Sequence, residues 1–334
     1  MKRLLLSLLL LVLLCGSAAA AGWSPVTITD DSGYTSEISA VPETIVSLGP
    51  SNTEILFALG LDDKVAGVTE YCNYPEAAKT KSIVSGVSSI NVEKIVALNP
   101  DLILANAING EDNIAHLRKL GYTVLVLNPD SVEGTFSSMR RIGDATNTSA
   151  AAESLIDSMQ QRLDAAAEKI TAGEKLTVTH LMSNDPYWVS GVHTFQNELI
   201  MRAGGENAFP EVDGWGIVNL EHLLITDPDI ILVDSGAGMG EKGENILKKS
   251  IMTDPRLSSL SAVKNNRVYV MDSDIFDRGG PRIVDALDDL IAVMYPATSE
   301  EPAATPQASG FGAGVLLTAA VFGLVVLRRE KLCP

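Results

Sequence analysis

The sequence predicts an α/β fold of two Rossmann-like lobes with parallel-type sheets, joined by one long α-helix. Three observations lead to this prediction: short apolar strands alternate with helical segments, a helical stretch without strand signals divides the chain, and matching passages occur on both sides of it. Strands separated by helices indicate parallel βαβ units. The 334 residues are enough for two lobes with hydrophobic cores.

The N-terminal lobe is expected over residues 44–130, after short strands and turns in 22–43. One helix is expected from Ser51 to Leu59, with Ser51 or Asn52 as its N-cap and Gly60 ending it. Apolar runs bounded by polar or turn residues predict four strands, and two further segments have helical patterns. The strands are 45–49, 64–69, 101–106 and 123–128, and the further helices are 92–98 and 114–121.

The linking segment is residues 131–172, which contain no strand signal and are rich in Ala, Glu, Gln, Leu and Met. Apolar residues recur there at helical spacing, which predicts one long amphipathic helix with a possible break near Asn147. The strand–helix alternation then resumes in a C-terminal lobe over residues 173–297. Its expected strands are 176–182, 229–234 and 267–272, with a helix over 196–203.

An internal repeat relates the two lobes. NVEKIVALNPDLIL begins at Asn91 and NLEHLLITDPDIIL begins at Asn219, and a weaker echo pairs Glu54 with Glu198. The repeat unit is too long for a solenoid, so it predicts two similar lobes facing each other. Clefts between domains are where small ligands bind. The matched pairs are Asn91 with Asn219, Glu93 with Glu221, Pro100 with Pro228, and Asp101 with Asp229.

Composition excludes some functions. The formal net charge is −17. So acidic a surface repels phosphate backbones, which makes nucleic acid a poor partner. A role in solubility alone would also account for this charge. Of three cysteines, only Cys72 lies in the expected soluble body, which leaves no internal disulfide and no paired-cysteine metal spacing there.

Both ends of the chain carry membrane-related signals. Residues 1–21 have a basic start, an apolar run and small residues, as in a secretory signal peptide. Cleavage after the alanine run is favoured over lipidation of Cys15, because Leu14 stands before that cysteine where lipidation sites have a small residue. A linker over 298–309 leads to an uncharged stretch, 310–327, that would be about 27 Å long as a helix. The basic tail, 328–334, then predicts a transmembrane anchor with a cytoplasmic C-terminus and the body outside.

The body also resembles a known family. The passages IVSLGPSNTEILFALG, EYCNYPEAA, INVEKIVALNPDLILA, PYWVSG, AGGENAF, VNLEHLL and DSDIFDRGGPR occur in order between residues 42 and 296. They resemble the helical-backbone solute-binding proteins of ABC importers for cobalamin, iron siderophores and heme, and most of all the cobalamin-binding members. The stretch SGFGAG, the apolar run and the two arginines resemble the archaeal PGF-CTERM surface-anchoring signal, with Ser309 where that signal has proline.

The resemblance implies an extracytoplasmic protein that captures a small ligand, a corrinoid or an iron chelate, and delivers it to a permease dimer with its ATPase subunits. It also implies that the linking helix limits the motion of the lobes. A surface structural or adhesion protein on the same fold is the alternative from another class, and its cleft would be filled by side chains.

Candidate ligand-binding residues gather in loops of the expected cleft. The resemblance places Tyr71, Trp188, Trp215 and Asp274 at cobalamin-contacting positions, while Val87 and Ile275 stand where the cobalamin-binding protein has tryptophan. Aromatic side chains in loops suit a flat, apolar ligand, although tryptophan is more often a packing residue. Further candidates at the cleft edge are Pro50, Ser51 and Asn52, which are otherwise an ordinary helix start, and Arg278, which is otherwise a solvated loop charge.

Glu93 and Glu221 have two interpretations. Each follows an asparagine at a helix start, where a carboxylate favours the helix dipole. Their matched positions, one in each lobe, fit the resembling family, whose paired glutamates dock onto arginines of the permease. Charge pairs at an exposed rim steer and register partners. The repeat therefore favours a role in permease docking.

Signals for catalysis or for a bound metal are absent from the sequence. The four histidines, His116, His180, His193 and His222, are scattered, so no metal site is predicted. No GxSxG, Walker A or strand-linked GxGxxG motif occurs, so we expect neither an enzyme nor an ATPase, and no cofactor apart from the ligand.

Overall fold

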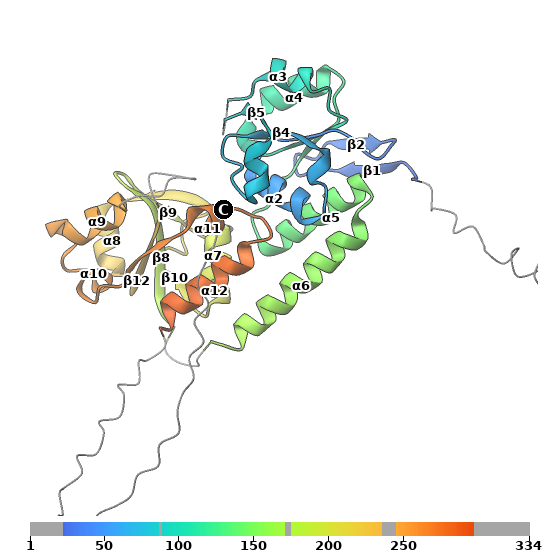
Figure 1. The fold of residues 1–334 in the computed structure, drawn as a ribbon. Coiled ribbons are helices and arrows are strands. Elements are labelled where there is room, and N and C mark those ends of the chain that lie inside the picture. The colour runs from blue at the N-terminus through green and yellow to red at the C-terminus, as the bar shows by residue number, and fades with distance from the viewer. Residues whose placement is uncertain (1–22, 87–88, 171–174, 236–244, 297–334) are drawn as a thin grey trace, which may run out of the picture. The chain divides into compact units, whose positions relative to one another are not determined.

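The computed structural model describes residues 23–86, 89–170, 175–235 and 245–296 (Figure 1). The chain divides into two compact units, Met1–Pro296 and Ala297–Pro334, and every described residue belongs to the first. The predicted signal peptide, linker, anchor and tail therefore lie outside the described residues, as does Val87. Within the described part of the chain, no helix is long and apolar enough to cross a membrane.

The N-terminal lobe contains a sheet of five parallel strands in the order β5-β4-β3-β6-β7. An antiparallel hairpin, β1 (Val26–Thr29) and β2 (Thr35–Ile38), precedes it, as the short-strand pattern predicted. The parallel order confirms the βαβ units read from the sequence. The strands are β3 (Ile45–Ser47), β4 (Val65–Thr69), β5 (Ser82–Ser85), β6 (Leu102–Ala105) and β7 (Val124–Val126), with helices α2 (Pro50–Ala58), α3 (Val92–Ala97) and α4 (Glu111–Lys119).

Helix α2 begins differently from the prediction. Its N-cap is Gly49 and its first residue is Pro50, so neither Ser51 nor Asn52 caps it. The fixed φ of proline suits the first helical position, which moves the start one residue earlier. Asn52 is instead buried, and its side-chain amide donates to the Ala105 carbonyl at 3.2 Å.

The linking segment, predicted as one long helix, forms two helices, α5 (Val132–Thr146) and α6 (Ser149–Ala167). The break falls at Asn147, whose left-handed conformation (φ 60°) ends α5. The turn packs tightly: a Cβ on Gly143 would lie 2.9 Å from the Cβ of Ala152. Ion pairs from Arg162 to Asp285 (2.7 Å) and Asp288 (2.8 Å) then fasten α6 to the last helix of the C-terminal lobe.

The C-terminal lobe has a mixed sheet in the order β11-β9-β8-β12-β13, with β10 beside β8. Strands β8, β12 and β13 are parallel as predicted, whereas β9 and β11 are antiparallel and lie where loops were expected. The strands are β8 (Thr177–Asn184), β9 (Tyr187–Ser190), β10 (Glu206–Asn207), β11 (Trp215–Val218), β12 (Ile230–Asp234) and β13 (Val268–Met271). The helices are α7 (Phe195–Arg202), α8 (Leu220–Thr226), α9 (Ile246–Thr253), α10 (Ser261–Lys264), α11 (Ser273–Phe276) and α12 (Ile283–Met294). Single 3-10 turns occur at Asp62–Lys64, Glu76–Thr80, Ala107–Asn109 and Pro255–Leu257.

The internal repeat folds into matching structures. In each lobe a short helix ends with a residue of positive φ and leads through a buried proline into a buried strand. The aspartate after that proline then holds the start of the neighbouring strand: Asp101 accepts from the Thr44 amide at 2.9 Å, and Asp229 accepts from the Thr177 amide at 2.8 Å. The repeat therefore marks equivalent positions of the two lobes, which makes Glu93 and Glu221 structurally comparable.

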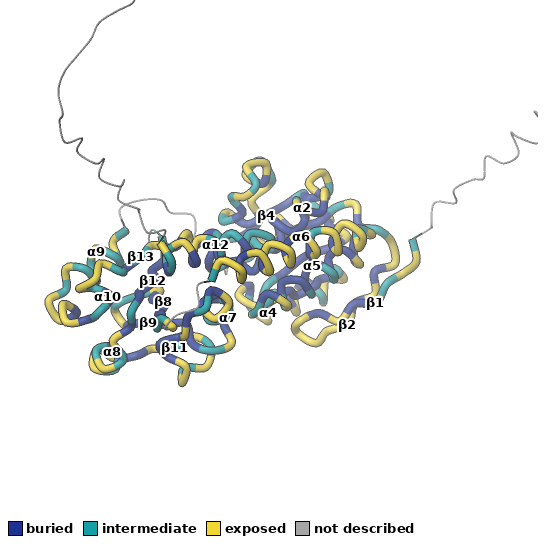
Figure 2. The backbone as a smooth tube through the Cα atoms, turned by 90° about the horizontal axis from the view of Figure 1, so that it is seen from below, coloured by how far each residue is buried: buried dark blue, intermediate teal, exposed yellow. Residues whose placement is uncertain are grey.

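Three hydrophobic clusters hold these elements. One packs the inner face of the C-terminal sheet against α12 and continues through α6 and α5 into the N-terminal lobe. The other two cover the opposite faces of the two sheets. Figure 2 shows the result, with buried residues in the first half of β8 and along β12, and mainly intermediate and exposed residues on the outer helix α9. The polar residues that interrupt this core between the lobes form the candidate site.

Candidate functional site

A buried ion-pair network joins the two lobes. Glu54 on α2 accepts from Arg278 at 3.2 Å and from Arg282 at 2.6 Å, so residues 224 and 228 positions apart are paired. The side chains of Glu54 and Arg278 are only 2% and 3% exposed. Arg278 also pairs with Asp274 at 2.5 Å. Two guanidinium groups thus meet two carboxylates, and the network is balanced in charge.

Of the predicted ligand residues in this region, some reach the cavity between the lobes and others do not. The cavity has a volume of about 160 Å³, and Pro50, Ser51, Tyr71 and Arg278 are part of its wall. Asn52 is buried beneath it, and Asp274 accepts from the Asn73 amide at 2.7 Å as well as from Arg278. The complete lining is Leu48, Gly49, Pro50, Ser51, Thr69, Tyr71, Asn106, Ile108, Pro129, Phe195, Asp277, Arg278 and Gly279.

The two predicted tryptophans lie on neighbouring strands of the C-terminal lobe, rather than in loops. Trp188 of β9 pairs with Ile217 of β11, and Trp215 pairs with Ser190, so both indoles project from the same face of the sheet. They are 38% and 37% exposed, and neither is in the wall of the cavity. Together with Ile217 and Met182, which are also exposed, they make an apolar surface, the aromatic patch.

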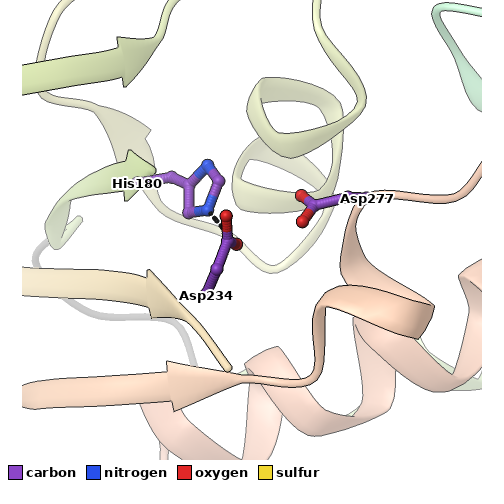
Figure 3. A group of neighbouring side chains, drawn as sticks. All are labelled: His180, Asp234 and Asp277. Carbon is purple, nitrogen blue, oxygen red and sulfur yellow. Dashed lines mark hydrogen bonds and ion pairs between the residues drawn. The ribbon is translucent and has the colours of Figure 1, made fainter. Parts of the chain in front are cut away.

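A cluster that the sequence did not indicate connects the patch with the cavity. His180 on β8, Asp234 at the end of β12 and Asp277 after α11 bring their donor atoms within 4.8 Å of one another (Figure 3). His180 is fully buried and its Nε2 lies 2.8 Å from Asp234. The Trp215 ring packs edge-on against the imidazole at 5.7 Å, while Asp277 lies in the cavity wall.

The electrostatics of this cluster are unusual. Burial raises the pKa of Asp277 to about 7, and the nearby carboxylate of Asp234 adds to that rise. Burial alone would lower the pKa of His180, but its hydrogen bond to Asp234 and the charges of both aspartates raise it above the ordinary value. Gln196 orients Asp277 by donating to it at 2.8 Å. Among the described residues, one buried carboxylate (Asp234) and one half-buried carboxylate (Asp277) therefore face at most one positive charge.

Glu93 and Glu221 both lie in the first turn of their helices and are exposed. Each helix is capped by the predicted asparagine: Asn91 accepts from the Lys94 amide at 2.9 Å, and Asn219 accepts from the His222 amide at 2.8 Å. The helix-start interpretation of the asparagines is therefore confirmed. Because both glutamates point into solvent at matched positions, they are available to a partner.

Comparison with known proteins shows the family to which this chain is similar. Residues 45–275 match the periplasmic binding protein family. The chain belongs to this family. It is 36% identical over 285 residues to YvrC, an uncharacterized ABC transporter substrate-binding lipoprotein of Bacillus subtilis, covering 83% of this chain and 88% of that protein.

Two solved structures of the family share the fold. The vitamin B12-binding protein BtuF of Vibrio cholerae superposes with a TM-score of 0.66 at 27% identity, covering 76% of this chain and 96% of that one. The heme-binding protein RhuT of Roseiflexus gives a TM-score of 0.67 at 27% identity, covering 76% and 98%. These relatives are therefore a substrate-binding lipoprotein of an ABC transporter and two periplasmic binding proteins.

Proposed function

We propose that this protein is the extracytoplasmic solute-binding component of an ABC importer and that its ligand is a corrinoid or an iron chelate such as heme or a ferric siderophore. The observation that carries the proposal is the cavity between the two lobes, lined from both sides and adjoining an exposed aromatic patch. Such a cavity favours binding over a purely structural or adhesive role, for which the cleft would be filled. Family membership supports a non-enzymatic function.

The volume of the cavity limits how much of a ligand can enter it. A tetrapyrrole macrocycle is far larger than a cavity of about 160 Å³. Such a ligand would insert one edge or substituent between the lobes and lay its flat face on Trp188 and Trp215. A corrinoid is our first candidate because of the sequence resemblance. Heme and ferric siderophores are the next candidates. Ile275 stands where the resembling cobalamin-binding protein has tryptophan, so the surface here is less aromatic than that cobalamin site.

The deciding experiment is a visible absorption spectrum of the body purified from its source, since a corrinoid, a heme and a ferric siderophore absorb differently. Tryptophan fluorescence titrations of the ligand-free body with cyanocobalamin, hemin and a ferric catecholate would then rank affinities. Quenching by one of the three with micromolar or tighter affinity supports the proposal. Absence of any bound chromophore together with no quenching by any of the three would contradict it.

Trp215→Ala should weaken binding of the ranked ligand by about 1–3 kcal/mol, or roughly 5- to 150-fold in Kd, because a large aromatic contact is lost. The control is Tyr34→Ala, which removes another exposed aromatic ring, from the β1–β2 turn, and should leave Kd unchanged. Equal affinities of the Trp215→Ala variant and the unmodified chain would exclude the aromatic patch from the site.

We also propose that residues 310–327 anchor the body to the outer face of the membrane. The full chain should stay with membranes after a high-salt wash, whereas a chain ending at Pro296 should be soluble. As a matched control, arginine at both Leu316 and Val321 should release the full-length chain, because each charge at the centre of a helix opposes insertion by about 2.5–3.5 kcal/mol. Recovery of the unaltered chain in the soluble fraction would contradict the anchor.

A further inference from the structure

Among the residues that the structure describes, the charge of the His180, Asp234 and Asp277 cluster is unbalanced when both carboxylates are ionised. Its two carboxylates face one imidazole, whereas the neighbouring network of Glu54, Asp274, Arg278 and Arg282 is already neutral and has no positive charge to spare. Buried carboxylates without a counter-charge are strongly unfavourable, and proteins meet this situation by protonation or by binding a metal.

The polar atoms around the cluster are also incompletely satisfied. The Nδ1 atom of His180 is buried and has no hydrogen-bond partner among the described residues, and the same is true of the Ser190 hydroxyl on the adjoining strand β9. His180 has no exposed surface, and its other nitrogen faces Asp234 (Figure 3). The described residues therefore leave part of this site's hydrogen-bonding capacity unused.

The donor set is suited to a transition metal. Imidazole nitrogen with two carboxylate oxygens is a combination used for Zn²⁺, Mn²⁺ or Fe²⁺, whereas Mg²⁺ and Ca²⁺ prefer oxygen ligands alone. Donors that share such an ion at about 2.0–2.2 Å lie about 3–4 Å apart. The three donor atoms lie within 4.8 Å of one another, and the imidazole and Asp234 are in direct contact at 2.8 Å, so side-chain rotations would have to separate this pair to admit the ion. Gln196 already holds one oxygen of Asp277, as an outer partner of a metal ligand does.

We propose that His180, Asp234 and Asp277 bind a divalent transition-metal ion on the C-terminal side of the cavity. Because Asp277 is part of the cavity wall, the ion would keep a coordination position open toward the ligand cleft. A donor atom of a bound chelate could fill that position. The metal site itself requires no particular ligand, so it can be tested independently of the proposed transport function.

The test uses the tag-free, full-length chain, stripped with a chelator and titrated with Co²⁺ and Zn²⁺ alone. We expect one equivalent of Co²⁺ to bind with a visible d–d absorption band, and Zn²⁺ to displace it and to raise the melting temperature. Asp277→Asn keeps the side-chain volume and an acceptor for Gln196, so it should fold while weakening metal binding at least tenfold. Asp234→Asn should do the same.

The matched control is Asp213→Asn. Asp213 pairs with His193 at 2.8 Å, but both side chains are highly exposed, and among the described residues they belong to no group of three potential metal ligands. This variant should bind Co²⁺ as the unmodified protein does. The proposal is overturned if the unmodified protein binds no stoichiometric metal, which would leave shared protons to balance the cluster. It is also overturned if Asp277→Asn binds Co²⁺ undiminished, or if Asp213→Asn loses the site.

Discussion

Glu54→Ala is expected to lower the free energy of unfolding of the body by about 3–5 kcal/mol, because it removes one partner of a buried ion pair. Glu54 is the carboxylate shared by Arg278 and Arg282, and the Arg278 side chain is 3% exposed. The substitution would leave two guanidinium groups between the lobes with one carboxylate, that of Asp274, in the network. A loss of this size is a large part of the stability of an ordinary domain. Urea denaturation followed by far-ultraviolet circular dichroism measures it.

The control for this prediction is Glu43→Ala. Glu43 makes an ion pair with Lys64 at 3.0 Å, but its side chain is 77% exposed, so its removal should change the stability by about 1 kcal/mol or less. Glu54→Gln adds a second comparison, since it keeps the volume and one acceptor but removes the charge. If Glu54→Ala destabilised the protein no more than Glu43→Ala, the network would not hold the lobes together.

The parallel core of each lobe could be predicted because its signals are local. Runs such as DLILAN and DIILVD are continuously apolar and bounded by proline and polar residues, which is typical of strands buried on both faces. The repeat added the equivalence of the lobes, because Asp101 and Asp229 repeat one hydrogen-bond pattern. The apolar runs depend on neighbours in sequence, and the repeat is visible as matching text, so both can be recognised in a single sequence.

The missed features depend on distant residues. Strands β9 and β11 are four residues each, too short for a clear alternating pattern, so the sequence predicts loops around Trp188 and Trp215. In the sequence, His180 has no nearby ligand residues, because its partners Asp234 and Asp277 come from the end of β12 and from the residue after α11. In the sequence, Glu54 is notable only for its weak match with Glu198, although it pairs with an arginine 224 residues away. No local spacing encodes such encounters.

Replacing both Glu93 and Glu221 with alanine should abolish delivery to the importer while leaving ligand affinity unchanged. Both carboxylates are exposed at equivalent helix starts, one in each lobe, and neither is part of the cavity wall. A permease of two like subunits would offer two equivalent basic patches, so one carboxylate in each lobe fixes the register of docking. Transport and stimulation of ATPase activity in proteoliposomes should fall to background, and each single variant should lose part of both.

The alternative is that these glutamates only favour their helix dipoles, by about 0.3–1 kcal/mol each. The matched control is therefore the double variant Glu111→Ala and Glu133→Ala, which removes two other exposed carboxylates from first helical turns. Both double variants should lose similar, small amounts of stability, but only the first should lose transport. Residual transport by single variants should weaken further as salt is raised, since rim charge pairs are screened. Normal transport by the Glu93 and Glu221 double variant would reduce both residues to helix-start carboxylates and remove docking from the proposed function.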